Sequence, residues 1–114
     1  MTNNIIADLS MDFSVAIVNI CDSIKGKSAI VNQLLRNGTS IGANIHEANY
    51  ASSRADFIAK MQIALKECYE TEYWLELFVK TNIIPESQYN TLKNNCGKIR
   101  KLLIASINTA KANQ

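Results

Sequence analysis

Apolar residues recur three or four positions apart along four stretches of the chain, and each stretch predicts one amphipathic α-helix. The predicted helices span about residues 4–24, 28–50, 54–81 and 85–111. The connections between them are short, so consecutive helices must run antiparallel. We therefore expect an all-α fold, a single domain over residues 1–114 that forms an antiparallel up-down four-helix bundle. The expected core stripes are, helix by helix, Ile5, Leu9, Phe13, Ala16, Ile17, Ile20 and Ile24; Ile30, Leu34, Ile41, Ile45 and Ala48; Phe57, Met61, Ala64, Cys68, Leu75 and Phe78; and Tyr89, Leu92, Cys96, Ile99, Leu103, Ser106 and Ala110.

Start and stop signals support these boundaries. Gly26 tolerates the left-handed backbone that ends many helices, and Ser28 is a candidate N-cap for the second helix. Ser53 followed by Asp56 resembles a capping box for the third helix. Pro85 suits the first position of the fourth helix, where its missing N–H is not needed. With one proline and four glycines in all, the chain has too few turn residues for a fold of many short strands.

Gly38 and Gly42 lie inside the second predicted helix, where each costs about 1 kcal/mol relative to alanine. They are four residues apart and so share one side of the helix. The favoured interpretation is a flat strip that allows another helix to approach closely. A groove for a small molecule or nucleotide, and a hinge, are the alternatives.

Several polar residues fall close to apolar stripes and are expected to be partly buried. Buried carboxylates need partners, because an unpaired buried charge is costly. Arg36, Asn44 and Lys66 are the candidate partners. We expect a structural polar network that fixes the packing, rather than a pair of catalytic acids, formed by Arg36, Ser40, Asn44, Glu47, Glu70 and Glu72.

The third predicted helix is apolar on more than one side. Tyr69, Tyr73, Trp74 and Leu77 lie away from its main stripe. A helix in a lone bundle needs only one buried stripe, and aromatic residues are enriched at interfaces between subunits. This second flank predicts a homo-oligomer interface.

Charge is distributed unevenly, although the net charge is only +2. The first helix carries aspartates and no basic residue, whereas the fourth is rich in lysine. One interpretation is pairing between neighbouring helices or subunits. The other is a basic face for RNA or DNA, on which Lys93, Arg100 and Lys111 share one side of the helix because they are seven and eleven residues apart.

Residue types that carry chemistry are scarce. His46 is the only histidine, so a His-based triad or a multi-His metal site within one chain is excluded. No glycine-rich phosphate loop is present. We therefore expect no catalytic site, no metal site and no cofactor. Cys21, Cys68 and Cys96 are interpreted as reduced core residues of a cytoplasmic protein, and neither a membrane span nor a signal peptide is expected.

Two runs of sequence, residues 33–48 and 57–75, resemble a bacterial family of four-helix-bundle proteins encoded in intervening sequences of 23S ribosomal RNA genes. An acidic pair in the second run, Glu70 and Glu72, also matches that family. The motif Q-x-x-R-x-x-x-S-I-x-x-N-I-x-E is matched at Gln33, Arg36, Ser40, Ile41, Asn44, Ile45 and Glu47.

The resemblance implies a cytoplasmic bundle that assembles into a homo-oligomeric ring, commonly a pentamer, and implies no enzyme. A related group, similar in fold, serves as accessory proteins of diversity-generating retroelements and binds nucleic acid and a reverse transcriptase. This chain departs from that group because it is only mildly basic. The leading hypothesis is thus a non-catalytic, ring-forming interaction protein with nucleic acid as a candidate partner. The alternatives are an accessory subunit of a reverse transcriptase, a bundle that binds a small ligand, and an enzyme whose site forms between subunits.

Overall fold

The computed structural model describes residues 4–113, and these form four α-helices: α1 Asn4–Ser23, α2 Ser28–Asn49, α3 Arg54–Lys80 and α4 Glu86–Ala112. The predicted all-α fold is confirmed for this part of the chain, which contains no strand. Residues 1–3 and 114 of the expected domain lie outside it. The molecule is elongated, with extents of 46 × 20 × 19 Å.

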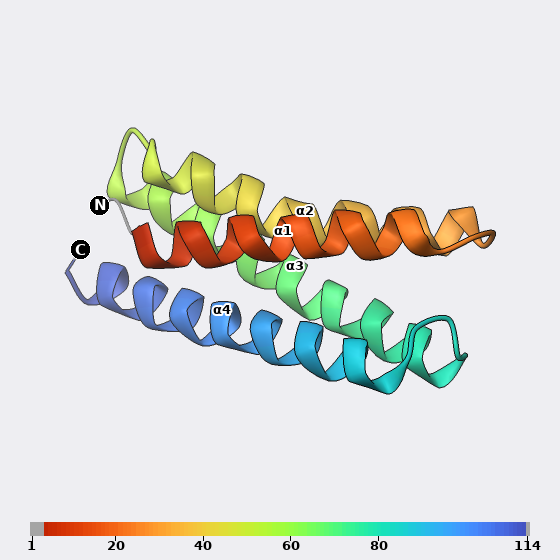
Figure 1. Ribbon diagram of the computed structural model, residues 1–114. Helices are drawn as coiled ribbons and strands as arrows, with labels where there is room; N and C mark the ends of the chain where they lie inside the picture. Colours follow the sequence, from red (N-terminus) through yellow and green to blue (C-terminus); the bar gives the residue numbers. More distant parts are fainter. Residues whose placement is uncertain (1–3, 114) are drawn as a thin grey trace.

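Each helix packs against two others, as in a four-membered bundle. Close backbone contacts join α1 to α2, α2 to α3, α3 to α4 and α4 to α1, whereas the backbones of the diagonal pairs α1/α3 and α2/α4 do not approach as closely within the described residues. The α2–α3 seam is the most extensive and the α1–α4 seam is the loosest. Figure 1 shows α3 passing behind α1, with the beginning of α1 and the end of α4 at the same end of the bundle.

The helix ends follow the predicted positions to within two residues, with two differences in capping. Lys27, rather than Ser28, is the N-cap of α2, and it adopts a left-handed conformation (φ 56°) directly after Gly26 (φ 77°). Pro85 is extended (ψ 157°), so it precedes the first turn of α4 rather than belonging to it. At α3 the expected cap forms, because Ser53 Oγ accepts a hydrogen bond of 3.1 Å from the Asp56 backbone N–H.

The core is formed by the expected stripes, with a shift of one residue in three helices. In α2, Val31 is buried and the expected Ile30 only half-buried. Ile6 is fully buried while Ile5 is exposed, since Ile6 and not Ile5 lies seven and eleven residues before Phe13 and Ile17, on the same side of the helix. In α4, Ile107 is buried and Ser106 only half-buried. All six expected stripe residues of α3 are buried. No helix among residues 4–113 is both long and apolar enough to cross a membrane.

Candidate functional surfaces

A buried amide links α2 to α3. The Asn37 side chain is 5% exposed and donates two hydrogen bonds from Nδ2, one to Glu67 Oε1 at 2.8 Å and one to Glu70 Oε2 at 2.7 Å. Its Oδ1 accepts a third bond, of 3.0 Å, from the indole Nε1–H of Trp74. Both amide protons and the amide oxygen are therefore engaged. The side chain joins one position of α2 to three positions along α3.

Sequence reasoning missed Asn37, although a signal was present. Asn37 follows Leu34 by three residues and precedes Ile41 by four, so it lies within the apolar stripe of α2. A polar residue inside a buried stripe must find partners. Asn37 is the partner of Glu70. The sequence had suggested Arg36, Asn44 or Lys66 for that role.

The other members of the expected polar network do not join this cluster. Arg36 is exposed and donates to Gln33 Oε1 at 2.8 Å, and Asn44 donates to the Ser40 carbonyl of its own helix at 2.8 Å. Glu47 was expected to be at least partly buried, and this is wrong: the residue is exposed, its side chain to 55%, and it pairs with Lys60 across the α2–α3 seam at 3.0 Å. That hydrogen bond and the charge of Glu47 raise the pKa of the Lys60 ammonium.

Glu72 has a different partner, on α4. Its Oε2 lies 3.3 Å from Arg100 Nε, and the Arg100 guanidinium lies 5.8 Å from the centre of the Tyr69 ring. Burial lowers the pKa of the guanidinium, but the charge of Glu72 and the hydrogen bond to it more than offset this effect, so the pKa is raised. Arg100 is therefore held within its own chain by an acid and an aromatic ring.

The pairing of Arg100 with Glu72 removes one of the expected residues from the free basic face of α4. Of its three expected residues, Arg100 is half-buried and paired, whereas Lys93 and Lys111 are exposed. The Lys93 ammonium lies 5.6 Å from the centre of the Tyr89 ring. Lys98 and Lys101 are also exposed. Within residues 4–113 none of these four lysines forms an ion pair.

The two glycines of α2 face α1. A Cβ atom added at Gly38 would lie 2.9 Å from both branches of the Ile17 side chain, and one at Gly42 would lie 3.1 Å from Ser14 Oγ and 3.3 Å from the Ser10 carbonyl oxygen. Ile17 is fully buried. Helix α1 thus approaches α2 so closely that a Cβ at Gly38 would require Ile17 to shift, and a Cβ at Gly42 would require its neighbours to give by a few tenths of an ångström.

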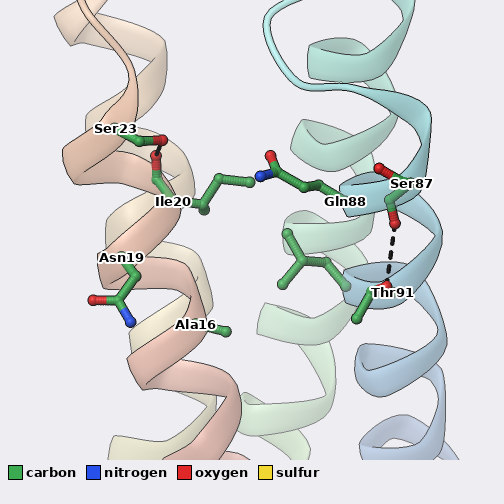
Figure 2. Close-up of a pocket in the computed structure, with 8 residues that line it drawn as sticks. Ala16, Asn19, Ile20, Ser23, Ser87, Gln88 and Thr91 are labelled. Atoms are coloured by element: carbon green, nitrogen blue, oxygen red, sulfur yellow. Dashed lines mark hydrogen bonds between the residues drawn. The ribbon is translucent and has the colours of Figure 1, made fainter.

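Grooves run along two seams of the bundle. Figure 2 shows the groove between α1 and α4, of about 490 Å³, in which the Gln88 side chain reaches from α4 toward Ile20 of α1. It is open to solvent and has no charged side chain in its lining, which consists of Ala16, Asn19, Ile20, Ser23, Ser87, Gln88, Thr91 and Leu92. The second groove, of about 670 Å³, lies between α1 and α2 over Gly42 and is bordered by Asp8, Met11, His46 and Glu47. Both are surface grooves rather than closed apolar cavities.

Two helices expose apolar side chains on their outer sides. On α1, Met11, Val15 and Val18 are 64%, 52% and 39% exposed, and at 100° per residue they lie within an arc of about 60°. We call these three residues the α1 face. On α3, Tyr69 and Tyr73 are 52% and 62% exposed, and we call them the α3 face.

Only part of the oligomer interface expected on α3 is therefore exposed. Tyr69 and Tyr73 point outward, whereas Trp74 and Leu77 are half-buried and pack against the core of their own chain. The α1 face was not expected from the sequence, because only one apolar stripe was predicted along that helix. The signal was there: Met11, Val15 and Val18 are four and three residues apart.

The cysteine thiols are shielded from solvent, whereas the one histidine is exposed. Cys21, Cys68 and Cys96 are all buried and free, as expected of core thiols. Burial, followed by the charge of Asp22, raises the pKa of the Cys21 thiol to about 11. A hydrogen bond with Cys68, together with burial, raises the pKa of Cys96. His46 is exposed and its ring lies against that of Tyr50, with the ring centres 5.1 Å apart and the ring planes tilted by 53°.

Comparison with known proteins identifies the family. The sequence profile of the 23S rRNA-intervening sequence proteins matches residues 2–105. No curated protein matches. Among solved structures, the chain is similar to a crystal structure from Bacteroides thetaiotaomicron VPI-5482, described as a protein with unknown function from the S23 ribosomal protein family. The two share 50% sequence identity with a TM-score of 0.85, over 90% of this chain and 97% of the other. The resemblance noted in the sequence is thus confirmed, and the chain belongs to the 23S rRNA-intervening sequence protein family.

Proposed function

We propose that this chain is a non-catalytic interaction protein that assembles with copies of itself. The observation that carries the proposal is the pair of exposed apolar faces, Met11, Val15 and Val18 on α1 and Tyr69 and Tyr73 on α3. Apolar side chains gathered on one side of an outer helix are typical of protein–protein contacts. The preferred assembly is a ring of five copies, as the family resemblance implies, in a cytoplasmic protein with reduced cysteines.

The polar groups support the non-catalytic part of this proposal. A catalytic acid, base or nucleophile needs a pKa close to the working pH. The Cys21 thiol, with a pKa of about 11, is shifted away from neutrality by burial. Glu67, Glu70 and Glu72 accept hydrogen bonds from Asn37 or Arg100, side chains that connect one helix to the next. These contacts stabilise the packing of the bundle.

The test is the mass of the particle in solution. Light scattering at micromolar concentration is expected to return a multiple of 12.7 kDa. A double variant, Val15→Glu/Tyr73→Glu, should dissociate while retaining its helical circular dichroism, since both side chains are exposed. The matched control is Asn94→Glu/Ala105→Glu, which adds the same two charges at exposed positions of α4. A parent protein that is a monomer would overturn the proposal.

Nucleic acid is a second candidate partner, favoured by one observation: the exposed lysines Lys93, Lys98, Lys101 and Lys111 form no ion pair with the described residues. Assembly would repeat this set in every copy, so that a modest charge per chain becomes a stronger field and a multivalent surface. The family is that of the 23S rRNA-intervening sequence proteins and the similar crystal structure is of a protein with unknown function, so the alternative of a reverse-transcriptase accessory subunit gains no support.

Gel shifts with structured RNA and duplex DNA test this second candidate. Binding to phosphates should be saturable, depend little on sequence and fall steeply as salt is added. The variant Lys93→Glu/Lys111→Glu should lose it with the oligomer intact. Arg100 is unsuitable for this purpose because its replacement would also break the contact with Glu72. No shift at about 50 mM salt with micromolar protein would overturn nucleic-acid binding.

A further inference from the structure

We infer that α4 binds double-helical nucleic acid, which lies along the helix and is held through its phosphates. The inference rests on the second candidate of the proposed function, nucleic-acid binding, and adds the form of the nucleic acid and the surface that it contacts. Exposed side chains on one side of α4 form this surface, which we call the α4 stripe: Asn90, Lys93, Asn94, Lys101, Asn108 and Lys111.

The α4 stripe follows one side of a long helix. At 100° per residue its members lie within an arc of about 100°. Its outermost lysines, Lys93 and Lys111, are about 27 Å apart at a rise of 1.5 Å per residue. Within residues 4–113 the side chains of the stripe form no hydrogen bond and no ion pair. The stripe is therefore a row of donors that can bind a partner.

The charge of the α4 stripe suits an extended polyanion. Lysine and asparagine side chains both donate hydrogen bonds to phosphate oxygens. Glu86 is the only acid of α4, and it lies in the first turn, before the stripe begins. We leave Lys98 out of the stripe because it shares a small groove with Asp12 of α1. The remaining lysines are spread along the helix with no carboxylate of α4 between them.

The side chains of the α4 stripe favour a duplex over a single strand. Proteins that hold single strands combine a basic groove with exposed rings on which the bases stack. Tyr89 is the only aromatic residue of α4; it is half-buried, and Lys93 lies over its ring. A double helix keeps its bases stacked inside and presents a continuous row of phosphates, to which the donors of the stripe are matched.

The exposed rings of the neighbouring helix α3 are less suited to nucleic acid, because they lie beside acids. Tyr69 and Tyr73 are on that helix, and Glu76 is exposed three residues after Tyr73. Glu72 pairs with Arg100, the cation that lies over the Tyr69 ring, and so offsets its charge. A strand stacked on these rings would meet carboxylates, whereas a duplex along the stripe meets none from α4.

Fluorescence anisotropy with labelled nucleic acids tests the form that is bound. The probes are a mixed-sequence duplex of about 20 base pairs, prepared as RNA and as DNA, and each of the separate strands, at about 50 mM salt. A duplex should bind at least about tenfold more tightly than its own strands, and its affinity should fall steeply as salt is added. Either duplex that meets this expectation supports the inference, and the comparison of RNA with DNA identifies which of the two is preferred.

The variant Lys101→Gln tests the place of the duplex on α4. It should weaken binding to all duplex sequences alike and reduce the slope of log affinity against log salt by at least about one unit, with the mass of the particle unchanged. The matched control Lys25→Gln removes the same charge from an exposed position after α1 and should leave binding unchanged. Equal losses in the two variants, or single strands that bind as tightly as the duplex, would overturn the inference and leave nucleic-acid binding standing. No binding to any probe would overturn both.

Discussion

Trp74 and Asn37 are joined by a hydrogen bond of 3.0 Å that crosses the α2–α3 seam, from the indole Nε1–H to the amide oxygen. The same amide donates to Glu67 and Glu70, so its removal would leave the indole without an acceptor and two carboxylates without that donor. Three groups on α3 thus depend on one side chain of α2.

Asn37→Ala should lower the free energy of unfolding by about 1–3 kcal/mol, the range for leaving buried polar groups unsatisfied. Chemical denaturation followed by circular dichroism measures it. Asn44→Ala is the matched control, because Asn44 is in the same helix but bonds only to the Ser40 carbonyl. If Asn37→Ala and Asn44→Ala lose the same free energy of unfolding, the hydrogen bonds of Asn37 to α3 add nothing to stability.

Gly38→Ala should destabilise the protein by about 1–3 kcal/mol although alanine is the better helix former, because overfilling a packed core costs more than the propensity gains. The new Cβ would meet Ile17 at 2.9 Å. The control is Gly97→Ala, where the nearest atom, Arg100 Nη2, lies 3.6 Å away. Gly97→Ala should stabilise by about 0.5–1 kcal/mol. Thermal unfolding compares the two, and a Gly38→Ala protein that melts above its parent would contradict the close approach of α1.

Glu72→Gln should lower the free energy of unfolding by about 1 kcal/mol, since it leaves the half-buried Arg100 without its ion pair. Glu47→Gln should have a smaller effect, because the side chain of Glu47 is more than half exposed and exposed pairs contribute little. Denaturation at low and high salt measures both. A larger loss of stability in Glu47→Gln than in Glu72→Gln would be inconsistent with the greater exposure of Glu47.

Stability should fall as the pH rises above about 9. The folded-state pKa of Cys21 is about 11 against an ordinary value of 9.0, so the folded protein holds this proton more tightly than the unfolded chain. The resulting stabilisation is present below pH 9 and is lost as the pH rises through 11. Melting temperatures between pH 8 and 11 should decline less steeply in Cys21→Ala than in the parent. If the melting temperatures of Cys21→Ala and the parent decline equally with pH, the Cys21 thiol does not contribute to the loss of stability at high pH.

Much of the fold could be predicted from the sequence because it depends on local spacing. Four stripes, the Ser53 cap and the turn at Gly26 are all set by residues a few positions apart. The contacts between helices were predicted less well. Asn37 and Glu70 are 33 residues apart, and Arg100 and Glu72 are 28 apart. Periodicity assigns a residue to one side of its helix, and it places Asn37 in the buried stripe of α2. It does not say which side chain of the next helix lies opposite, and for this reason the contact between Asn37 and Glu70 was missed and Arg100 was assigned to a free basic face.

The loose α1–α4 seam has a consequence for how the chain folds. Every other seam joins helices that follow one another in the sequence, so the α1–α4 seam alone requires the two ends of the chain to meet. The most extensive seam, α2–α3, joins the two central helices through a short connection. Contacts between neighbours in sequence cost little loop-closure entropy, and chains dominated by them fold quickly. The bundle is expected to form from its central pair outward, with α1 and α4 closing against each other last.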